Sequence, residues 1–275
     1  MVGTRTDFGA ERGRISGRDE GGRMGCGHID GWTLVVDESM RDYFAPTTKY
    51  NYKRFVIVKN LFYKDSLLEE TFFTPKGMTR TVIFDDMAQC TEEGVQGLLP
   101  LVAAQRREQA LAYKHTFGRF ACLKSYVMLR ELLLELGAIG SDELPRFVIT
   151  EHGKPELEGH SGLHFSISHC RCAIAVAVSD APVGIDAECR RKVSPSLLRY
   201  TMNDEELGLI EASADPEGEF TRLWTRKEAV LKQRGTGITA DLKDVLVGLP
   251  PHIRLTTHDH APLKYFHSLA CESND

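Results

Sequence analysis

Residues 184–188, Gly-Ile-Asp-Ala-Glu, alternate between apolar and acidic side chains, and this alternation limits what the second half of the chain can form. In an extended strand, residues i and i+2 point to the same side of the backbone. Asp186 and Glu188 therefore share one side, and Ile185 points to the other side, where burial can anchor it. The spacing predicts a strand that presents two carboxylates to one point in space.

A third carboxylate lies on a helix that we expect over residues 219–233. Glu228 and Lys232 are four positions apart, so their side chains are neighbours on one helix face. Mg²⁺ in proteins prefers a few carboxylate oxygens and takes its remaining ligands from water and from substrate phosphates. Carboxylates flanked by lysines therefore indicate Mg²⁺-dependent chemistry on a phosphate ester. The expected ligands of Mg²⁺, or of Mn²⁺ in its place, are Asp186, Glu188 and Glu228.

Each of these features also has an ordinary structural explanation. An isolated D-x-E is more often a pair of solvated charges after a strand, and Glu228 with Lys232 could be a routine surface pair. The neighbouring Trp224 and Leu231 indicate instead that this helix surface is partly packed. The two acidic segments taken together favour a metal site over two unrelated surface features.

Two upstream segments complete a set of four motifs. Residues 153–155 are Gly-Lys-Pro, and residues 165–169 are Phe-Ser-Ile-Ser-His. With the acidic strand and the W-T-R-K-E-A-V-L-K helix that follow, the chain resembles the 4′-phosphopantetheinyl transferases of the larger, surfactin-synthetase-associated type. That family carries G-K-P, S-[IV]-S-H, G-[VI]-D-x-E and W-x-x-K-E-A-x-x-K in this order. The resemblance extends from about Arg107 to the C-terminus and includes nothing of the first part of the chain.

The resemblance implies an α+β fold of two pseudo-symmetric halves. Each half would be a small, mainly antiparallel sheet packed with helices, and the active site would lie between the halves. The expected halves are residues 78–181 and 182–275.

Local patterns predict several of the elements. Residues 119–136 have apolar side chains near helical spacing, and residues 172–178 alternate bulky side chains with alanine, which is typical of a strand whose alanine face is closely packed. Weaker strands are expected over residues 245–247, 253–256 and 265–269.

The first 77 residues have a different character. Residues 4–27 are rich in Gly, Arg and Asp and have almost no large apolar side chains, a composition typical of disorder. We therefore interpret residues 1–77 as an N-terminal extension of poor order. Two origins are open, an accessory segment or an upstream extension from a misassigned start, and composition favours the second.

The resemblance also implies how coenzyme A would be bound. Lys154, Ser168 and His169 would contact its 3′-phosphate, although a Ser-His pair by itself is more often structural. Arg119 or Lys124, in a basic stretch that is otherwise a solvated helix face, would contact a nucleotide phosphate.

The activity that the resemblance implies is transfer of the 4′-phosphopantetheine group of coenzyme A to a serine of an apo carrier protein, with release of adenosine 3′,5′-bisphosphate. Lys227 and Lys232 would add positive charge to the pyrophosphate oxygens. The catalytic residues would be Glu228 and Lys232, and the base is either Glu228 or a metal-bound water that it orients. The carrier could be an acyl, polyketide or peptidyl carrier protein.

Two other functions use the same residues. A Mg²⁺-dependent phosphohydrolase would need the same carboxylates and no surface for a carrier. A catalytically silent protein that binds coenzyme A or a carrier would not need them, so the intact Asp186, Glu188 and Glu228 count against it.

Composition limits the partners and the cellular compartment that we expect for this protein. A formal net charge of −5 gives no reason to expect nucleic-acid binding, and no apolar stretch is long enough for a membrane span. The seven cysteines show no regular spacing of the kind that a disulfide framework would have, which indicates a reduced, cytoplasmic protein. We also expect the protein to be a monomer. Cys170 and Cys172 have no second Cys/His cluster in the sequence to complete four zinc ligands, so we expect them to be small residues near a strand start.

Overall fold

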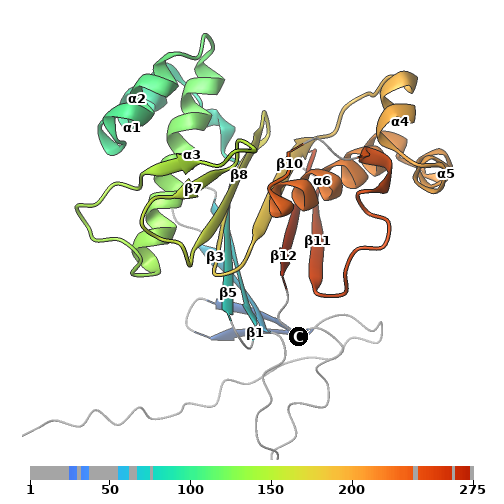
Figure 1. Ribbon diagram of the computed structural model, residues 1–275, viewed down its shortest axis with the longest axis horizontal. Coiled ribbons are helices and arrows are strands. Elements are labelled where there is room, and N and C mark those ends of the chain that lie inside the picture. The colour runs from blue at the N-terminus through green and yellow to red at the C-terminus, as the bar shows by residue number, and fades with distance from the viewer. Residues whose placement is uncertain are drawn as a thin grey trace, which may run out of the picture.

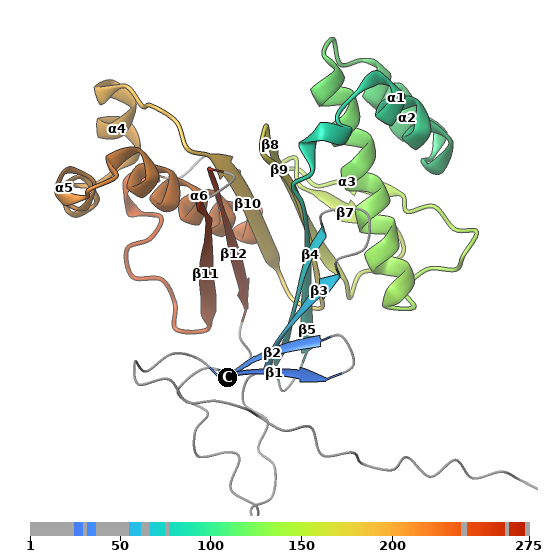
Figure 2. The same ribbon diagram turned by 180° about the vertical axis from the view of Figure 1, so that it is seen from behind.

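The computed structural model describes residues 25–29, 32–36, 55–61, 67–74, 77–237, 241–261 and 264–272. Antiparallel sheets with helices packed on them confirm the predicted α+β class. Figures 1 and 2 show two halves side by side, each with its own sheet and its own helices. No helix of the described ranges is long and apolar enough to cross a membrane.

The α-helices are α1 (Glu92–Leu98), α2 (Ala104–Leu111), α3 (Thr116–Glu135), α4 (Pro195–Thr201), α5 (Asp204–Ala212) and α6 (Pro216–Arg234). Three short 3₁₀ helices are η2 (Met87–Gln89), η3 (Leu99–Leu101) and η4 (Leu242–Asp244). The strands are β1 (Gly25–Ile29), β2 (Trp32–Val36), β3 (Phe55–Leu61), β4 (Leu67–Thr74), β5 (Gly77–Phe84), β6 (Phe147–Ile149), β7 (Pro155–Leu157), β8 (His164–Cys170), β9 (Ala173–Ser179), β10 (Val183–Cys189), β11 (Ile253–His260) and β12 (Tyr265–Glu272).

The larger sheet, within the described ranges, has the order β1-β2-β3-β4-β5-β9-β8 with antiparallel neighbours. Every residue of β9 is buried, and its two faces differ. The bulky side chains belong to the core that contains the buried face of α3, and the alanines belong to a second core shared with β10 and β12. The predicted close packing of the alanine face is therefore confirmed, because small side chains let the second half approach β9.

The helix α3 supplies most of the first core. It begins at Thr116 and ends at Glu135, close to the predicted residues 119–136, and it packs on β9. Phe120, Leu123 and Leu129 are at most 2 % exposed on its buried face. The Tyr126 hydroxyl is buried with them and donates to the Pro145 carbonyl at 2.9 Å, so the polar end of this side chain is satisfied.

The smaller sheet has the order β10-β12-β11 in the part of the chain that is described, and α6 packs on β10 and β12. Asp215 caps the start of α6 by accepting from the Gly218 amide at 2.9 Å, and Pro216 occupies its first turn. The helix ends at Gly235, whose φ of 71° is left-handed and suits glycine. It therefore extends slightly beyond both ends of the predicted residues 219–233.

Two predictions concern the ends of the chain. The predicted strand over residues 245–247 is wrong, since these residues form a turn directly after η4. The other two weak strands are confirmed, because β11 and β12 include them. Before Met78, strands β1–β4 pair in sequence up to β5, and residues 1–24 and 37–54 lie outside the described residues. The division of the chain at residue 77 stays a prediction.

Candidate active site between the two halves

The close contact of α6 with β10 brings the second-half carboxylates together. A Cβ atom at Gly184 would lie 2.0 Å from the Ala229 carbonyl oxygen and 2.3 Å from the Gln233 amide nitrogen, so only glycine permits this approach. Asp186 pairs across the sheet with Ser268, whose hydroxyl lies 2.9 Å from the Thr225 hydroxyl of α6. Asp186 therefore lies on the side of β10 that α6 covers, as the alternation in this segment predicts.

Asp186 is the best-buried carboxylate of the site, at 4 % exposed. Its Oδ1 accepts from the Ser168 hydroxyl at 2.8 Å and from the Lys232 ammonium at 2.7 Å. The same ammonium donates to the Ser168 hydroxyl at 2.9 Å, which closes a triangle between β8, β10 and α6. The other oxygen, Oδ2, is buried without a hydrogen-bond partner. Leaving such an atom unsatisfied is costly, and a cation would satisfy it.

The pKa values of the other two carboxylates, Glu188 and Glu228, are both raised. Burial, together with the charge of Asp186, raises the pKa of Glu188 to about 7, and Arg191 opposes the shift. Burial also raises the pKa of Glu228, again with a contribution from Asp186 and opposition from Lys232. Both side chains therefore lie where an added positive charge would favour their ionised forms.

These observations fit a hard cation in chemical type. The donors are carboxylate oxygens, one of them buried and unpartnered, and oxygen is what Mg²⁺ prefers. The three carboxylates are not tightly clustered. In the described part of the chain, their donor atoms do not all lie within 4.8 Å of one another. The Lys232 ammonium supplies the neutralising charge next to Asp186 in this arrangement.

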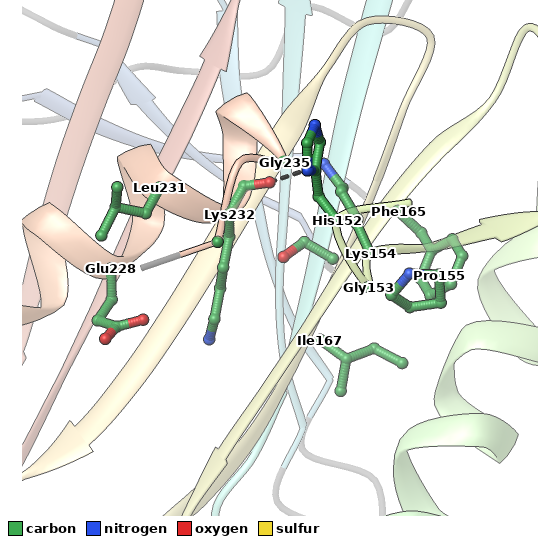
Figure 3. A pocket seen from close by; sticks show the side chains of 12 residues that line it. His152, Gly153, Lys154, Pro155, Phe165, Ile167, Glu228, Leu231, Lys232 and Gly235 are labelled. Carbon is green, nitrogen blue, oxygen red and sulfur yellow. Dashed lines mark hydrogen bonds between the residues drawn. The ribbon is translucent and has the colours of Figure 1, made fainter. Parts of the chain in front are cut away.

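A pocket of about 260 Å³ lies beside these charges and is lined by both halves. Figure 3 shows Glu228, Leu231 and Lys232 on the α6 side, with Phe165 and Ile167 of β8 across from them. The rest of the lining comes from the Gly-Lys-Pro segment with the residue before it, from β8, and from the two glycines after α6. These residues are His152, Gly153, Lys154, Pro155, Ser166, Gly235 and Gly237. Three of the four sequence motifs therefore meet at one pocket.

Lys154 lines this pocket, but its ammonium is already occupied. The Nζ atom donates to the carbonyl oxygens of Lys232 at 2.7 Å, Val183 at 3.3 Å and Gln233 at 3.5 Å. The first of these bonds is drawn as a dashed line in Figure 3. A lysine at the end of a helix favours the unpaired carbonyls there. This placement differs from the predicted contact with a phosphate, since Lys154 instead ties the turn before β7 to the end of α6.

Ser168 and His169 continue β8 beyond the pocket-lining Ile167. Ser168 belongs to the triangle with Asp186 and Lys232, so the structure gives it a partner that sequence did not indicate. The His169 side chain reaches solvent, and its ring meets Phe117 edge-on at 5.7 Å between ring centres. Crowding by protein atoms lowers the pKa of His169, and the charge of Lys232 adds to the effect.

Lys227 lies apart from the pocket, and its predicted phosphate contact stays a prediction. This side chain is 0 % exposed and lies in the second half, away from the pocket. Its ammonium donates to the Glu206 carboxylate at 2.6 Å and to the carbonyls of Thr201 at 2.9 Å and Leu242 at 2.7 Å. All three donors are therefore used, and Lys227 joins α6 to the end of α4, to α5 and to η4.

The two basic candidates on α3 also have partners in the first half. The Arg119 guanidinium donates to the Tyr113 carbonyl at 2.9 Å and to Glu92 at 3.5 Å. The Lys124 ammonium lies 4.3 Å from the centre of the Phe84 ring. Neither residue lines the pocket, and their contact with a nucleotide stays a prediction.

Sequence reasoning missed two site residues. The Ser166 hydroxyl accepts from the Ile185 amide at 3.0 Å, which attaches β8 to β10 beside the pocket. Ser166 and Ser168 are two positions apart on a strand, and this spacing could have indicated a shared polar face. Leu231 contributes an apolar wall from α6, and its position beside Lys232 was the available signal.

Fold and site together define an α+β protein whose two halves enclose a pocket beside buried carboxylates and a lysine. A family model for the 4′-phosphopantetheinyl transferase superfamily matches residues 182–273. The chain is 27% identical over 161 residues to the 4′-phosphopantetheinyl transferase ffp of Bacillus subtilis, across 58% of this chain and 71% of that protein. It is 29% identical over 171 residues to the 4′-phosphopantetheinyl transferase psf-1 of Bacillus pumilus, across 60% of this chain and 73% of that protein.

A shorter stretch is more similar to a further relative. Over 98 residues the chain is 40% identical to the 4′-phosphopantetheinyl transferase AcpT of Salmonella typhi, across 34% of this chain and 50% of that protein. The comparisons show that this chain is similar to the 4′-phosphopantetheinyl transferase superfamily, the family that the four motifs resemble.

Proposed function

We propose that the protein transfers the 4′-phosphopantetheine group of coenzyme A to a serine of an apo carrier protein and releases adenosine 3′,5′-bisphosphate. The observation that carries this proposal is the junction of Asp186, Ser168 and Lys232 beside a pocket that both halves line. A pocket with apolar walls and a few convergent polar groups is what a small-molecule substrate requires. The names of the relatives support the same reaction class.

In this reaction the serine oxygen of the carrier forms a bond to the β-phosphorus of coenzyme A. The bond from that phosphorus to the bridging oxygen breaks, and the nucleotide leaves with the electron pair. A serine hydroxyl is a weak nucleophile until its proton is removed. We propose that Glu228 accepts this proton, because burial and the charge of Asp186 raise the pKa of this carboxyl and make it a better base.

Lys232 has a separate part in the proposed reaction. Its ammonium lies at the edge of the pocket and is held by Asp186 and Ser168, so it is oriented before substrate arrives. A fixed positive charge next to the leaving phosphate would stabilise the charge that develops there.

Asp186, Glu188 and Glu228 are the residues that would hold Mg²⁺, or Mn²⁺ in its place. The unpartnered Oδ2 of Asp186 and the raised pKa values of the two glutamates support this assignment. When bound, the ion supplies positive charge to the pyrophosphate oxygens.

The test is to incubate the full chain with coenzyme A, Mg²⁺ and a panel of apo acyl, polyketide and peptidyl carriers, and to measure the intact mass of each carrier. Asp186→Asn and Glu228→Gln should each lower kcat/KM at least about 100-fold, the loss typical of a removed electrostatic group. Glu188→Gln should lose less, because water can replace one ligand of an open Mg²⁺ shell. The exposed Asp180→Asn is the matched control and should keep full activity.

Three other outcomes of this test contradict the proposal. Cleavage of coenzyme A without any modified carrier would identify a Mg²⁺-dependent phosphohydrolase. Binding of coenzyme A without cleavage would identify a catalytically silent protein. Full activity of Asp186→Asn would show that the metal is held elsewhere.

The setting of the reaction is part of the proposal. We propose a cytoplasmic monomer. The free thiols support a reducing compartment, and they belong to Cys90, Cys122, Cys170, Cys172, Cys189 and Cys271. Size-exclusion chromatography with light scattering checks the monomer, and the carrier panel identifies which carrier class is used.

A further inference from the structure

Three cysteines meet at one end of β8 and β10, on the side of β10 away from Glu188. Cys170 ends β8, Cys172 lies in the turn before β9, and Cys189 ends β10. Their sulfur atoms all lie within 4.8 Å of one another, and all three thiols are free. Among the described residues, this is the one set of three candidate metal ligands that are gathered so closely.

The strands explain why the thiols converge. Cys170 pairs with Ala173 at the closed end of the β8–β9 hairpin, so Cys172 lies directly beside it in the turn. Cys189 has the same strand parity as Ile185 and Ala187, whose side chains pack on the alanine face of β9 in a core that includes Cys170. The two ends of the cluster therefore come from different halves of the protein, and no spacing in the sequence joins them.

We propose that Cys170, Cys172 and Cys189 bind a thiophilic metal ion such as Zn²⁺. Thiolate sulfur is the ligand that selects soft and borderline ions, whereas Mg²⁺ selects oxygen, so this site and the carboxylate site would take different ions. Three thiols would release three protons to solvent and form three bonds to the ion. A fourth tetrahedral position would remain for water or a small ligand.

The position of the cluster gives a bound ion a structural consequence. Cys170 directly follows His169, and Cys189 directly follows Glu188. An ion held by all three sulfurs would fasten the β8–β9 hairpin of the first half to the end of β10 in the second half. It would thereby restrain the junction at which Asp186, Ser168 and Lys232 meet.

The experiment uses the full chain, purified with a chelator and a thiol reductant and then freed of both. Co²⁺ is the probe, because tetrahedral thiolate ligation gives an intense visible spectrum together with a near-ultraviolet thiolate-to-metal charge-transfer band. We expect one Co²⁺ per chain with this spectrum, its displacement by Zn²⁺, and its persistence in excess Mg²⁺.

The variants Cys172→Ser and Cys90→Ser form a matched pair, since both thiols are half-buried and Cys90 lies outside the cluster. Cys172→Ser should weaken Co²⁺ binding by more than the roughly 10–100-fold lost when a metal site loses only an outer-shell partner. Cys90→Ser should bind as the wild type does. Cys189→Ser provides a second variant, with circular dichroism as the check on folding.

The proposal is overturned if Co²⁺ shows only the weak spectrum of oxygen ligation, or if Cys172→Ser and Cys90→Ser bind Co²⁺ equally. It is also overturned if the reduced thiols disappear on exposure to air as a disulfide and no metal is bound under reducing conditions, because two of the sulfurs then form a redox pair. None of these outcomes depends on carrier modification, so the result stands apart from the proposed transferase activity.

Discussion

Two lysines of α6 show how position on a helix decides the role of a residue. Lys232 reaches the pocket and contacts Asp186, and it is partly exposed. Lys227 is fully buried against Glu206 and two carbonyls. Both residues lie in the W-x-x-K-E-A-x-x-K segment, but they lie on different faces of the helix and contact different parts of the protein.

Lys227→Met should therefore act on stability. Removing one partner of a buried ion pair leaves the other charge uncompensated and typically costs about 3–5 kcal/mol. Urea unfolding should show a loss of that size, and the exposed Lys192→Met should change the free energy of unfolding by less than about 0.5 kcal/mol. A raised KM for coenzyme A with unchanged stability would instead show that Lys227 contacts a phosphate of the substrate.

His169 and Lys154 should respond differently to loss of the 3′-phosphate from the substrate. A charge-assisted contact contributes roughly 1.5–3 kcal/mol, or about ten- to a hundredfold in affinity. His169→Ala should raise the KM for coenzyme A by about that factor and should matter little with dephospho-coenzyme A. Lys154→Ala should weaken both substrates alike, because its ammonium is bonded to α6. Equal losses for His169→Ala on both substrates would show that this ring does not hold the phosphate.

At the level of elements, the contact of α6 with β10 determines the geometry of the site. Gly184 leaves no room for a Cβ beneath α6, so Gly184→Ala must separate the helix from the strand. Overpacking of this kind typically costs about 1–3 kcal/mol. Activity should fall as well, because Asp186 and Glu228 lie on the two elements that are moved apart.

The control for this change is Gly208→Ala on α5. A Cβ there meets nothing within 4 Å, and the residue is exposed within the helix. Alanine is the better helix former, so stability should rise by up to about 1 kcal/mol. Thermal unfolding and turnover of both variants check the pair, and an unaffected Gly184→Ala would contradict the close packing described above.

For the whole molecule, histidines on β11 and β12 should make stability depend on pH. His260 and His267 are hydrogen-bonded at 2.8 Å between Nε2 and Nδ1, and His258 and Tyr265 stack on them. Burial, together with the neighbouring histidines, lowers the pKa of His260 to about 4 and that of His267 well below 6.5. The charge of Asp259 partly opposes the shift of His260.

The sign of the effect follows from proton binding. Below the ordinary pKa of about 6.5 the unfolded chain binds protons that the folded protein excludes, so stability falls as the pH decreases from about 6.5 toward 4. Each such histidine contributes at most about 1.4 kcal/mol per pH unit. Urea unfolding from pH 7 to 5 should show this slope, and His267→Gln should reduce it. The exposed His252→Gln should leave the slope unchanged, and a wild-type free energy that is constant over this range would contradict the prediction.

A chain that begins at Met78 tests the predicted division at residue 77. Every residue that we assign to the site follows this position, so we expect the shortened protein to fold and to transfer as the full chain does. The strand β4 pairs with β5 from Leu67 to Thr74, and truncation would leave that edge of β5 without its partner. Loss of solubility or of turnover would show that β1–β4 belong to the core of the first half.

The sequence alone determined the features that depend on local geometry. The period of a strand placed Asp186 and Glu188 on one side and Ile185 on the other, and the same rule identified the alanine face of β9. The period of a helix identified α3 and α6 to within a few residues. These patterns repeat over a few residues, so the backbone geometry of one segment is enough to read them.

Only the tertiary structure decided which distant groups meet. The burial of Lys227 against Glu206, the use of the Lys154 ammonium by α6, and the arrival of Cys189 beside Cys170 and Cys172 depend on how the helices and the two halves pack. Side chains of the same type are free to bind phosphate, to cap a helix or to neutralise a buried acid. The choice among these roles is made by partners far along the chain, and no local period encodes it.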